Sequence, residues 1–140
     1  MSLVMRVFGA LHANVYRLSG GKVGGVVGKA PILLLTVIGR KSGKTRTMPL
    51  GYSRDGERLL VVASALGAAK HPAWYLNLRA NPRVTVNLGA ATRPMVAETA
   101  GGEERARLWG RLIADFPFFV EHQQKTTREI PIVILSAANE

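Results

Sequence analysis

Hydrophobic side chains in the first eighteen residues recur at spacings of one, three or four positions. Residues so spaced fall on one face of a helix, so the pattern predicts an amphipathic helix over residues 1–18. Four glycines between positions 20 and 25 then predict a loose connector that extends to about residue 30. We expect the helix to dock on the domain, and leave open that it contacts a membrane surface or covers the substrate.

After the connector, short apolar runs alternate with turn residues, which is typical of strands. Asp55-Gly56 between two such runs predicts a tight hairpin with a type I′ turn. Pro72 predicts the start of a helix, with the proline at its first position, and Asn81-Pro82 predicts its end. Strands are expected over residues 31–38, 47–53, 58–64, 84–88, 95–97 and 130–135, and two further helices over 103–114 and 118–125.

These elements predict a single α+β domain over residues 1–140, built on a small barrel of about six mostly antiparallel strands. A composition of 47% hydrophobic and 20% charged residues fits an ordinary globular domain. The chain has no cysteine, which excludes disulfides and thiolate chemistry, and its three dispersed histidines lack metal-ligand spacing. No apolar run suits a membrane span and no signal peptide is visible, so we expect a cytoplasmic protein without a metal site.

Basic residues are concentrated in the first part of the chain. Nine of the 19 Lys and Arg residues precede Asp55, and no acidic residue does. The net charge of +10 therefore belongs mostly to this segment, which should attract anionic partners. The charge alone leaves nucleic acid, an anionic membrane surface and a polyanionic small molecule open.

Four cations lie within the eight residues Gly39–Arg46. Glycines let backbone N–H groups approach a ligand, and Lys and Arg bind carboxylate or phosphate, so this basic loop is a candidate oxyanion site. Gly43-Lys44-Thr45 matches the end of a P-loop, but the glycine spacing is one residue too short and Pro49 prevents the helix that should follow. Hydrolysis of a nucleoside triphosphate is not expected, and a solvated charged hairpin is the plain alternative.

A second candidate anion site runs from Ser64 through Gly67 to the helix start, where the N–H groups of Ala73 and Trp74 lack helical partners. If the strands 47–53 and 58–64 lie side by side, this segment and the basic loop face one ligand. Catalytic groups are scarce: no Ser-His-Asp order or paired carboxylate appears, and Ser42 and Ser64 have no nearby base. An enzyme of this kind would take its reactivity from a cofactor.

Three motifs cover about residues 30–136 and run from Leu34 to Leu50, from Ser64 to Pro82 and from Ile130 to Val133. Together they resemble the deazaflavin-dependent nitroreductase family of actinobacteria, in the coenzyme F420-specific branch of quinone and enone reductases. The resemblance implies a split β-barrel of the FMN-binding type. It also implies reduced F420 as cofactor, a 5-deazaflavin with a phosphate and a polyglutamate tail, which would pass a hydride to an electron-poor acceptor.

The resemblance further implies which residues bind the cofactor. Cations of the basic loop would meet the tail or the phosphate, Ser64 and the first amides of the following helix would hold the phospholactyl part, and residues 48–50 and 62–63 would line the ring. The implied set is Arg40, Lys41, Ser42, Lys44, Thr45, Arg46, Met48, Pro49, Leu50, Val62, Ala63, Ser64, Ala73, Trp74 and Asn77.

The sequence departs from the best-known nitroreductase pattern around the substrate. Ala65 stands where that pattern has a lysine, and Phe116, Phe119 and His122 stand where it has three tyrosines. We assign these last three residues to substrate binding. Their apolar character favours quinones or activated enones, such as coumarin-type lactones, over nitro compounds. His122 is a candidate proton donor, with a plain surface histidine as the alternative, and no other catalytic side chain is implied.

Two other classes of function stay open. A basic β-barrel would bind nucleic acid if Trp74, Tyr75 and the phenylalanines act as stacking platforms, although the basic loop lacks interleaved aromatic residues. A relative that binds FMN or haem, or that carries F420 without catalysis, is the other alternative. We expect a small-molecule electron acceptor rather than nucleic acid as partner, and leave a homodimer open.

Overall fold

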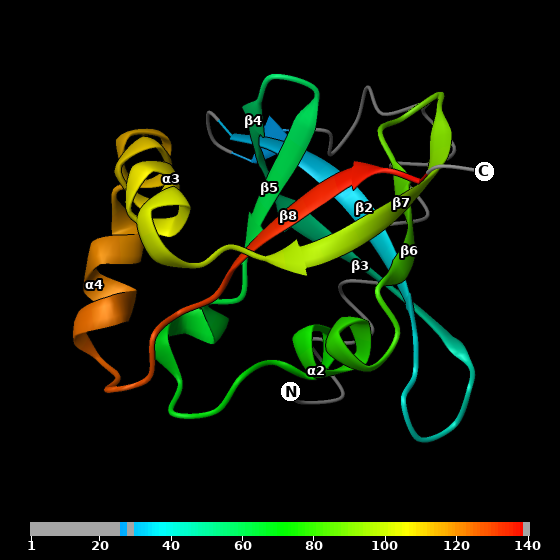
Figure 1. Cartoon of the computed structure of the whole chain (residues 1–140), viewed down its shortest axis with the longest axis horizontal. Helices are drawn as coiled ribbons and strands as arrows, with labels where there is room; N and C mark the ends of the chain where they lie inside the picture. Colours follow the sequence, from blue (N-terminus) through cyan, green and yellow to red (C-terminus); the bar gives the residue numbers. More distant parts are fainter. Residues whose placement is uncertain (1–25, 28–29, 139–140) are drawn as a thin grey trace.

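Eight antiparallel strands form one strongly curved sheet in the computed structural model, which describes residues 26–27 and 30–138 (Figure 1). The predicted helix 1–18 and most of the connector lie outside these residues. The strand order is β1-β2-β6-β7-β8-β5-β4, with β3 paired to β2. Among the described residues, no helix is both long and apolar enough to cross a membrane. The strands are β1 (Val26–Val27), β2 (Ala30–Ile38), β3 (Thr45–Gly51), β4 (Ser53–Asp55), β5 (Arg58–Val62), β6 (Arg83–Asn87), β7 (Thr92–Thr99) and β8 (Ile132–Ala137).

Three helices and one 3₁₀ turn accompany the sheet in the part of the chain that the structure describes. Helix α2 (Ala73–Ala80) lies across one end of the barrel, whereas α3 (Gly102–Asp115) and α4 (Phe118–Gln124) lie together beside it (Figure 1). The 3₁₀ turn η1 (Ala65–Gly67) follows β5 and contacts α4. The helices and most strands agree with the sequence-based boundaries to within a few residues.

The barrel has more strands than the six expected, for two local reasons. Val26–Val27, expected in the loose connector, pairs with the start of β2 as a short strand. The expected strand 47–53 is divided at Tyr52, whose amide donates to the Pro31 carbonyl at 3.2 Å. At this residue the chain exchanges one pairing partner, β2, for another, β5. The chain therefore bends at Tyr52 from one part of the sheet into another.

The prediction that strands 47–53 and 58–64 lie side by side is wrong for most of their length. The β4–β5 ladder ends at Ser53–Leu60, and β3 pairs only with β2 among the described residues. A continued ladder would pair Gly51 with Val62, but the bend at Tyr52 turns β3 away. The sheet is thus split at this place. We call the unpaired sides of residues 48–51 and 61–64 the β3–β5 edge.

Two turns also differ from prediction. In the β4–β5 hairpin Asp55 pairs with Arg58, so the two turn residues are Gly56 and Glu57. Only Gly56 has a positive φ, of 63°, which is the pattern of a type II′ turn and not of type I′. Helix α2 begins one residue later than expected, because Pro72 has an extended ψ of 152° and is the N-cap.

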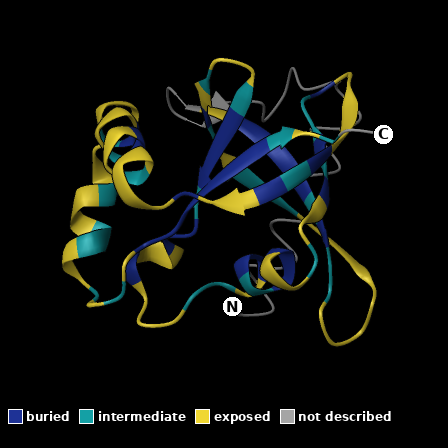
Figure 2. Cartoon of the chain, in the orientation of Figure 1, coloured by how far each residue is buried: buried dark blue, intermediate teal, exposed yellow. Residues whose placement is uncertain are grey.

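The central strands of the sheet are mostly buried (Figure 2), and their alternate residues pack into two separate cores. In β5, Leu59 and Val61 face the barrel interior, whereas Leu60 faces the other core, as the two-residue period of a strand requires. This explains the unbroken apolar run of β5. Helix α2 contributes Trp74, Tyr75 and Leu78 to the barrel interior, and α3 contributes Leu108 and Leu112 to the other core. The rings of Trp74 and Tyr75 are therefore buried and unavailable for stacking on bases.

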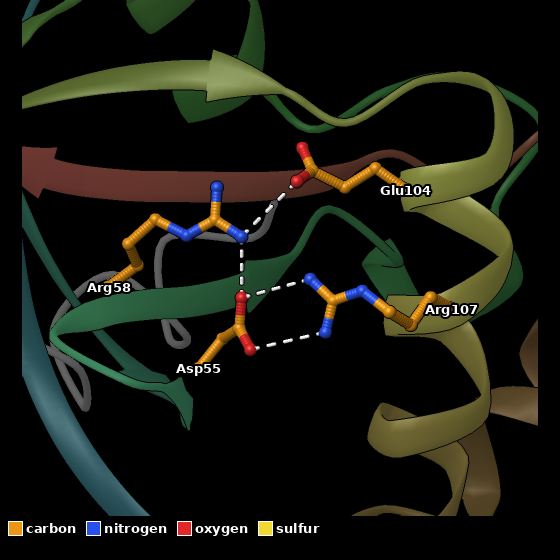
Figure 3. A network of polar contacts seen from close by, with 4 residues as sticks. All are labelled: Asp55, Arg58, Glu104 and Arg107. Atoms are coloured by element: carbon orange, nitrogen blue, oxygen red, sulfur yellow. Dashed lines mark hydrogen bonds and ion pairs between the residues drawn. The ribbon is translucent and has the colours of Figure 1, made fainter.

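Asp55 in the β4–β5 hairpin joins three other charged side chains (Figure 3). Its carboxylate accepts hydrogen bonds from Arg58 at 2.5 Å and from Arg107 at 3.1 Å. Arg58 also donates to Glu104 at 3.2 Å. The hydrogen bonds from Arg107 and Arg58 hold the pKa of Asp55 well below its ordinary value. Because Glu104 and Arg107 belong to α3, this network ties the helix to the hairpin.

We expect the Asp55→Asn variant to lose about 1 kcal/mol of unfolding free energy at pH 7, since partly exposed ion pairs contribute modestly. A carboxyl whose pKa is depressed in the folded state contributes stability above its unfolded pKa and loses it as the pH falls. The difference in melting temperature between wild type and variant should therefore be full at pH 7 and shrink below about pH 4. Thermal unfolding measured from pH 7 to 3 checks this, and a constant difference over that range would contradict it.

Candidate active site

The basic loop is a compact turn between β2 and β3. The Gly39 amide donates to the Lys44 carbonyl at 2.7 Å, and the Gly43 amide donates to the Gly39 carbonyl at 2.9 Å. Gly43 has a φ of +71°, which a side chain would strain. The hydroxyl of Ser42, a predicted ligand, accepts the Lys44 amide at 3.2 Å. Ser42 therefore already has a structural contact within the loop.

The other predicted ligands of this loop are exposed: Lys41, Lys44, Thr45 and Arg46. Among the described residues, none of the three cations of this group takes part in an ion pair. Elsewhere in the described chain, Arg58, Arg105 and Arg107 have carboxylate partners. The loop thus presents uncompensated positive charge to solvent, as an anion site requires.

Asn77 joins the basic loop to helix α2. Its side-chain oxygen accepts hydrogen bonds from the Arg40 amide at 3.1 Å and from the Arg40 guanidinium at 2.8 Å. Asn77 is only 7% exposed, so this contact fixes the loop against the end of the barrel. The two motifs expected to share one ligand are brought together here by α2, and not by neighbouring strands. Arg40 and Asn77, both predicted to bind the cofactor, are therefore hydrogen-bonded to each other.

The segment after β5 makes an unusual turn. Ser64 has a right-handed helical conformation, with φ −79° and ψ −38°, and is followed by Ala65 at φ +47°, Leu66 at φ +58° and Gly67 at φ +82°. A right-handed residue followed by a left-handed one turns successive N–H groups toward one point, which suits an anion. Alanine and leucine rarely adopt left-handed backbone, so the surrounding contacts must hold this turn in place.

Helix α2 begins close in sequence to this turn and presents its first amides. The first helical hydrogen bond is donated by Tyr75 to the Pro72 carbonyl at 3.1 Å. The preceding amides of Ala73 and Trp74 lie before the helical bonding pattern, as the prediction required. The Trp74 ring is 9% exposed within the barrel interior, so only its amide can meet a ligand. The site at α2 is therefore a backbone site.

The β3–β5 edge contains the five residues predicted to line a flat ring. Met48 and Leu50 are half-buried and pack against the barrel interior, as does the buried Ala63. Pro49 and Val62 are also half-buried. A strand edge without a partner has free N–H and C=O groups, so a ligand at this edge would bond to the backbone of residues 48–50 and of Val62. The backbone of Ala63 is already occupied, because its amide donates to the Pro131 carbonyl at 3.0 Å and its carbonyl accepts from Arg128 at 3.2 Å. The side chains of Met48, Leu50 and Ala63 pack on the barrel interior beneath the backbone of this edge.

Arg128 is a site residue that sequence reasoning missed. It lies just before the motif at residues 130–133, but a single cation in a polar stretch has no recognisable pattern. Its guanidinium donates to the carbonyls of Ala63 at 3.2 Å, Ser64 at 2.7 Å and Ala68 at 2.8 Å. It also lies 3.0 Å from Nδ1 of His71. Arg128 thus holds the end of β5 and the left-handed turn in one arrangement.

The three predicted substrate residues form a row on and beside α4. The Phe116 ring packs over Gly51, where an added Cβ would lie 3.6 Å from the ring. Ring centroids are 5.6 Å apart between Phe116 and Phe119, and 5.7 Å apart between Phe119 and His122. At the other end, His122 Nδ1 lies 2.5 Å from Ser64 Oγ. The row therefore spans the β3–β5 edge from Gly51 to Ser64.

The statement that Ser64 has no nearby base is consequently wrong. His122 follows Ser64 by 58 positions, and only the packing of α4 on η1 brings them together. Burial lowers the pKa of His122, and the Lys125 cation lowers it further against a smaller opposite effect of Glu121. Burial and the nearby Arg128 likewise lower the pKa of His71. Both imidazoles are therefore neutral at neutral pH.

A cavity of about 290 Å³ borders the site at Phe116. Among its lining residues, Ser53 donates a hydrogen bond to Asp115 at 2.6 Å, which ties β4 to the end of α3. Phe116 is 5% exposed and is the one predicted site residue in the lining. The lining consists of Pro31, Tyr52, Ser53, Arg54, Arg111, Asp115 and Phe116.

The curved antiparallel sheet, split along one edge, is that of the FMN-binding type of split barrel. The model of the F420H(2)-dependent quinone reductase family matches residues 9–137. A Mycobacterium tuberculosis protein with the provisional name F420H(2)-dependent quinone reductase Rv3178 is 46% identical over 105 residues, covering 75% of this chain and 88% of its own. The chain belongs to this F420H(2)-dependent quinone reductase family.

Two solved structures are similar to this chain in sequence and fold. One, of the F420-H2 dependent reductase FDR-A, is 41% identical, with a TM-score of 0.70, and the match covers 76% of this chain and 94% of that one. The other is described as a domain-swapped dimer and is 36% identical, with a TM-score of 0.73. The match covers 96% of this chain and 100% of that one. The predicted family, fold class and cofactor are confirmed: the protein is an oxidoreductase that uses reduced F420.

Proposed function

We propose that this protein binds reduced F420 along the β3–β5 edge and transfers its hydride to a quinone or an activated enone. The charged tail or phosphate of F420 binds Lys41, Lys44 and Arg46, while Ser64 and the first amides of α2 hold the phospholactyl part. The observation that carries this proposal is the Arg40–Asn77 contact, because it makes the basic loop and α2 parts of one site. The left-handed turn and the unpaired edge between them fit a phosphate and a flat ring.

When bound, reduced F420 supplies the hydride, and the side chains of this protein orient the two reactants and exclude water. The row Phe116, Phe119 and His122 forms the wall against which the acceptor lies. Two phenyl rings and a neutral imidazole stabilise a flat apolar acceptor and offer no cation to a nitro group. This supports quinones and coumarin-type lactones as acceptors ahead of nitro compounds.

The Lys41→Ala plus Arg46→Ala variant should bind F420 at least about tenfold more weakly, since two charge-assisted contacts are removed. F420 fluorescence titration of the purified protein measures this, at low and high salt. The matched control is Arg83→Ala plus Arg93→Ala, which removes the same charge from exposed positions on β6 and β7. Equal affinities for the two double variants would contradict the tail assignment.

The same preparation separates this function from the nucleic-acid alternative. A steep salt dependence of oligonucleotide binding without an F420 signal would favour that alternative. F420 binding without oxidation of its reduced form by any quinone or enone would favour a carrier. A homodimer is supported by the domain-swapped dimer of a related protein. Membrane contact through residues 1–18 and a cytoplasmic location stay predictions.

A further inference from the structure

Ser64 and His122 form a hydrogen-bonded pair at the middle of the candidate site. Ser64 Oγ lies 2.5 Å from His122 Nδ1, and the serine is 4% exposed. The Ser64 carbonyl is held by Arg128 at 2.7 Å. Two separate chain segments thus fix the pair. It joins the β3–β5 edge, along which F420 is proposed to lie, to the row of side chains proposed as the wall for the acceptor.

The surroundings of the imidazole also hold it in place. Its ring centroid lies 5.3 Å from that of Phe118 and 5.7 Å from that of Phe119. Below it, the His122 backbone packs on Gly67 so closely that an added Cβ would lie 2.6 Å from the His122 carbonyl oxygen. A surface histidine would not have such contacts on several sides.

We propose that Ser64 and His122 are a proton relay that protonates the acceptor oxygen after hydride transfer, an inference that rests on the proposed function. The acceptor gains a hydride with its electron pair and becomes an enolate or quinolate anion. The Ser64 hydroxyl gives its proton to that oxygen, and His122 Nδ1–H gives its proton to Ser64 Oγ. His122 Nε2 takes one proton from a water molecule, which leaves as hydroxide to bulk solvent, and the imidazole thereby changes from its Nδ1–H to its Nε2–H tautomer. The acceptor gains a hydride and a proton in total.

The charges around His122 suit this exchange. On its own helix, Lys125 opposes and Glu121 favours the imidazolium, with burial the largest effect, and the net result is a lowered pKa. From the other elements, residues 64–67 carry no charged side chain, and the Arg128 guanidinium lies on the Ser64 carbonyl. A neutral imidazole has one nitrogen that donates and one that accepts, which a relay needs.

The test compares two acceptors whose reduced anions differ in basicity. An enolate is a much stronger base than a quinolate, so a general acid matters more for an enone. We expect His122→Asn to lower kcat with a coumarin about 10²-fold and with benzoquinone less than about fivefold. Ser64→Ala, assayed at saturating F420 because this serine is also proposed to hold the phospholactyl part, should likewise lose more kcat with the coumarin than with benzoquinone. F420 affinity by fluorescence titration should stay within about twofold in His122→Asn, and Gln124→Ala on the same helix is the control.

His122→Asn separates relay from positioning, because the asparagine amide still donates to Ser64 Oγ but cannot pass a proton on. Wild-type rates with both acceptors in this variant would overturn the relay. An equal loss with coumarin and benzoquinone, or a large loss of F420 affinity, would overturn it too, since the pair would then serve binding or packing. If wild type binds F420 but reduces neither acceptor, the proposed function fails instead, before any variant is compared.

Discussion

Replacing Arg128 with methionine should lower the rate of F420H2 oxidation about 10²-fold and the free energy of unfolding by about 3 kcal/mol. The Arg128 guanidinium donates to the carbonyls of Ala63, Ser64 and Ala68. These carbonyls end β5 and enclose the left-handed turn. Without the guanidinium they lose a charged donor, and the strained backbone of Ala65 and Leu66 is free to relax.

Arg128→Lys distinguishes the charge of Arg128 from its geometry. Lysine keeps the positive charge but has no planar fork, so it can reach only part of the carbonyls. We expect it to recover less than half of the lost stability in thermal unfolding. Arg83→Met, at an exposed position of β6, is the control for loss of one cation. The role given to Arg128 would be contradicted if Arg128→Met kept both the melting temperature and the rate of F420H2 oxidation of wild type.

Gly67→Ala is the second change with a large expected effect. Gly67 has a φ of +82°, and an added Cβ would lie 2.6 Å from the His122 carbonyl oxygen and 2.9 Å from the Lys125 Cβ. The backbone strain and the clash with α4 together should cost about 3 kcal/mol of unfolding free energy. Because α4 must move away, His122 would leave Ser64, and the rate with a coumarin should fall about 10²-fold.

Gly56→Ala is the matched control, because it separates backbone strain from the clash. Gly56 has a φ of +63°, and a Cβ there would have no atom within 4 Å. This variant should lose only about 1 kcal/mol of unfolding free energy and keep full activity. Chemical denaturation of the two variants side by side gives the comparison. Equal losses of stability would mean that α4 does not press on Gly67.

The sequence predicted the regular elements well, because each has a local cause. The alternation of apolar runs and turn residues predicted most strands, and glycines at both ends of a cluster of cations predicted a basic loop over residues 39–46 as a candidate oxyanion site. The motifs also predicted the family and its cofactor correctly. The errors lie where chain geometry depends on distant partners. Tyr52 breaks a strand because its amide donates to the Pro31 carbonyl. The bend could not be predicted from the residues next to Tyr52, because that partner is distant in the sequence.

In the candidate site, too, properties with a local cause were predicted and contacts between distant residues were not. Glycine spacing and charge predicted two anion-binding segments, but the reason given for their proximity was wrong. Asn77 on α2 joins them through Arg40, and the neighbouring strands do not. Arg128 was missed because its partners are backbone carbonyls some 60 positions away. Every residue has a backbone carbonyl, so the sequence does not distinguish these partners from others.

By itself, the sequence determined the chemistry that this protein can hold: positive charge on one loop, no thiol, a Ser64 motif and three phenylalanines within residues 116–122. These properties depend on residue type and short spacing, which a chain carries in any conformation. Only the tertiary structure decided that His122 lies against Ser64 and that β3 does not pair with β5. The contact of His122 with Ser64 forms only when α4 packs against the left-handed turn. That packing depends on the two cores and therefore on the whole sheet.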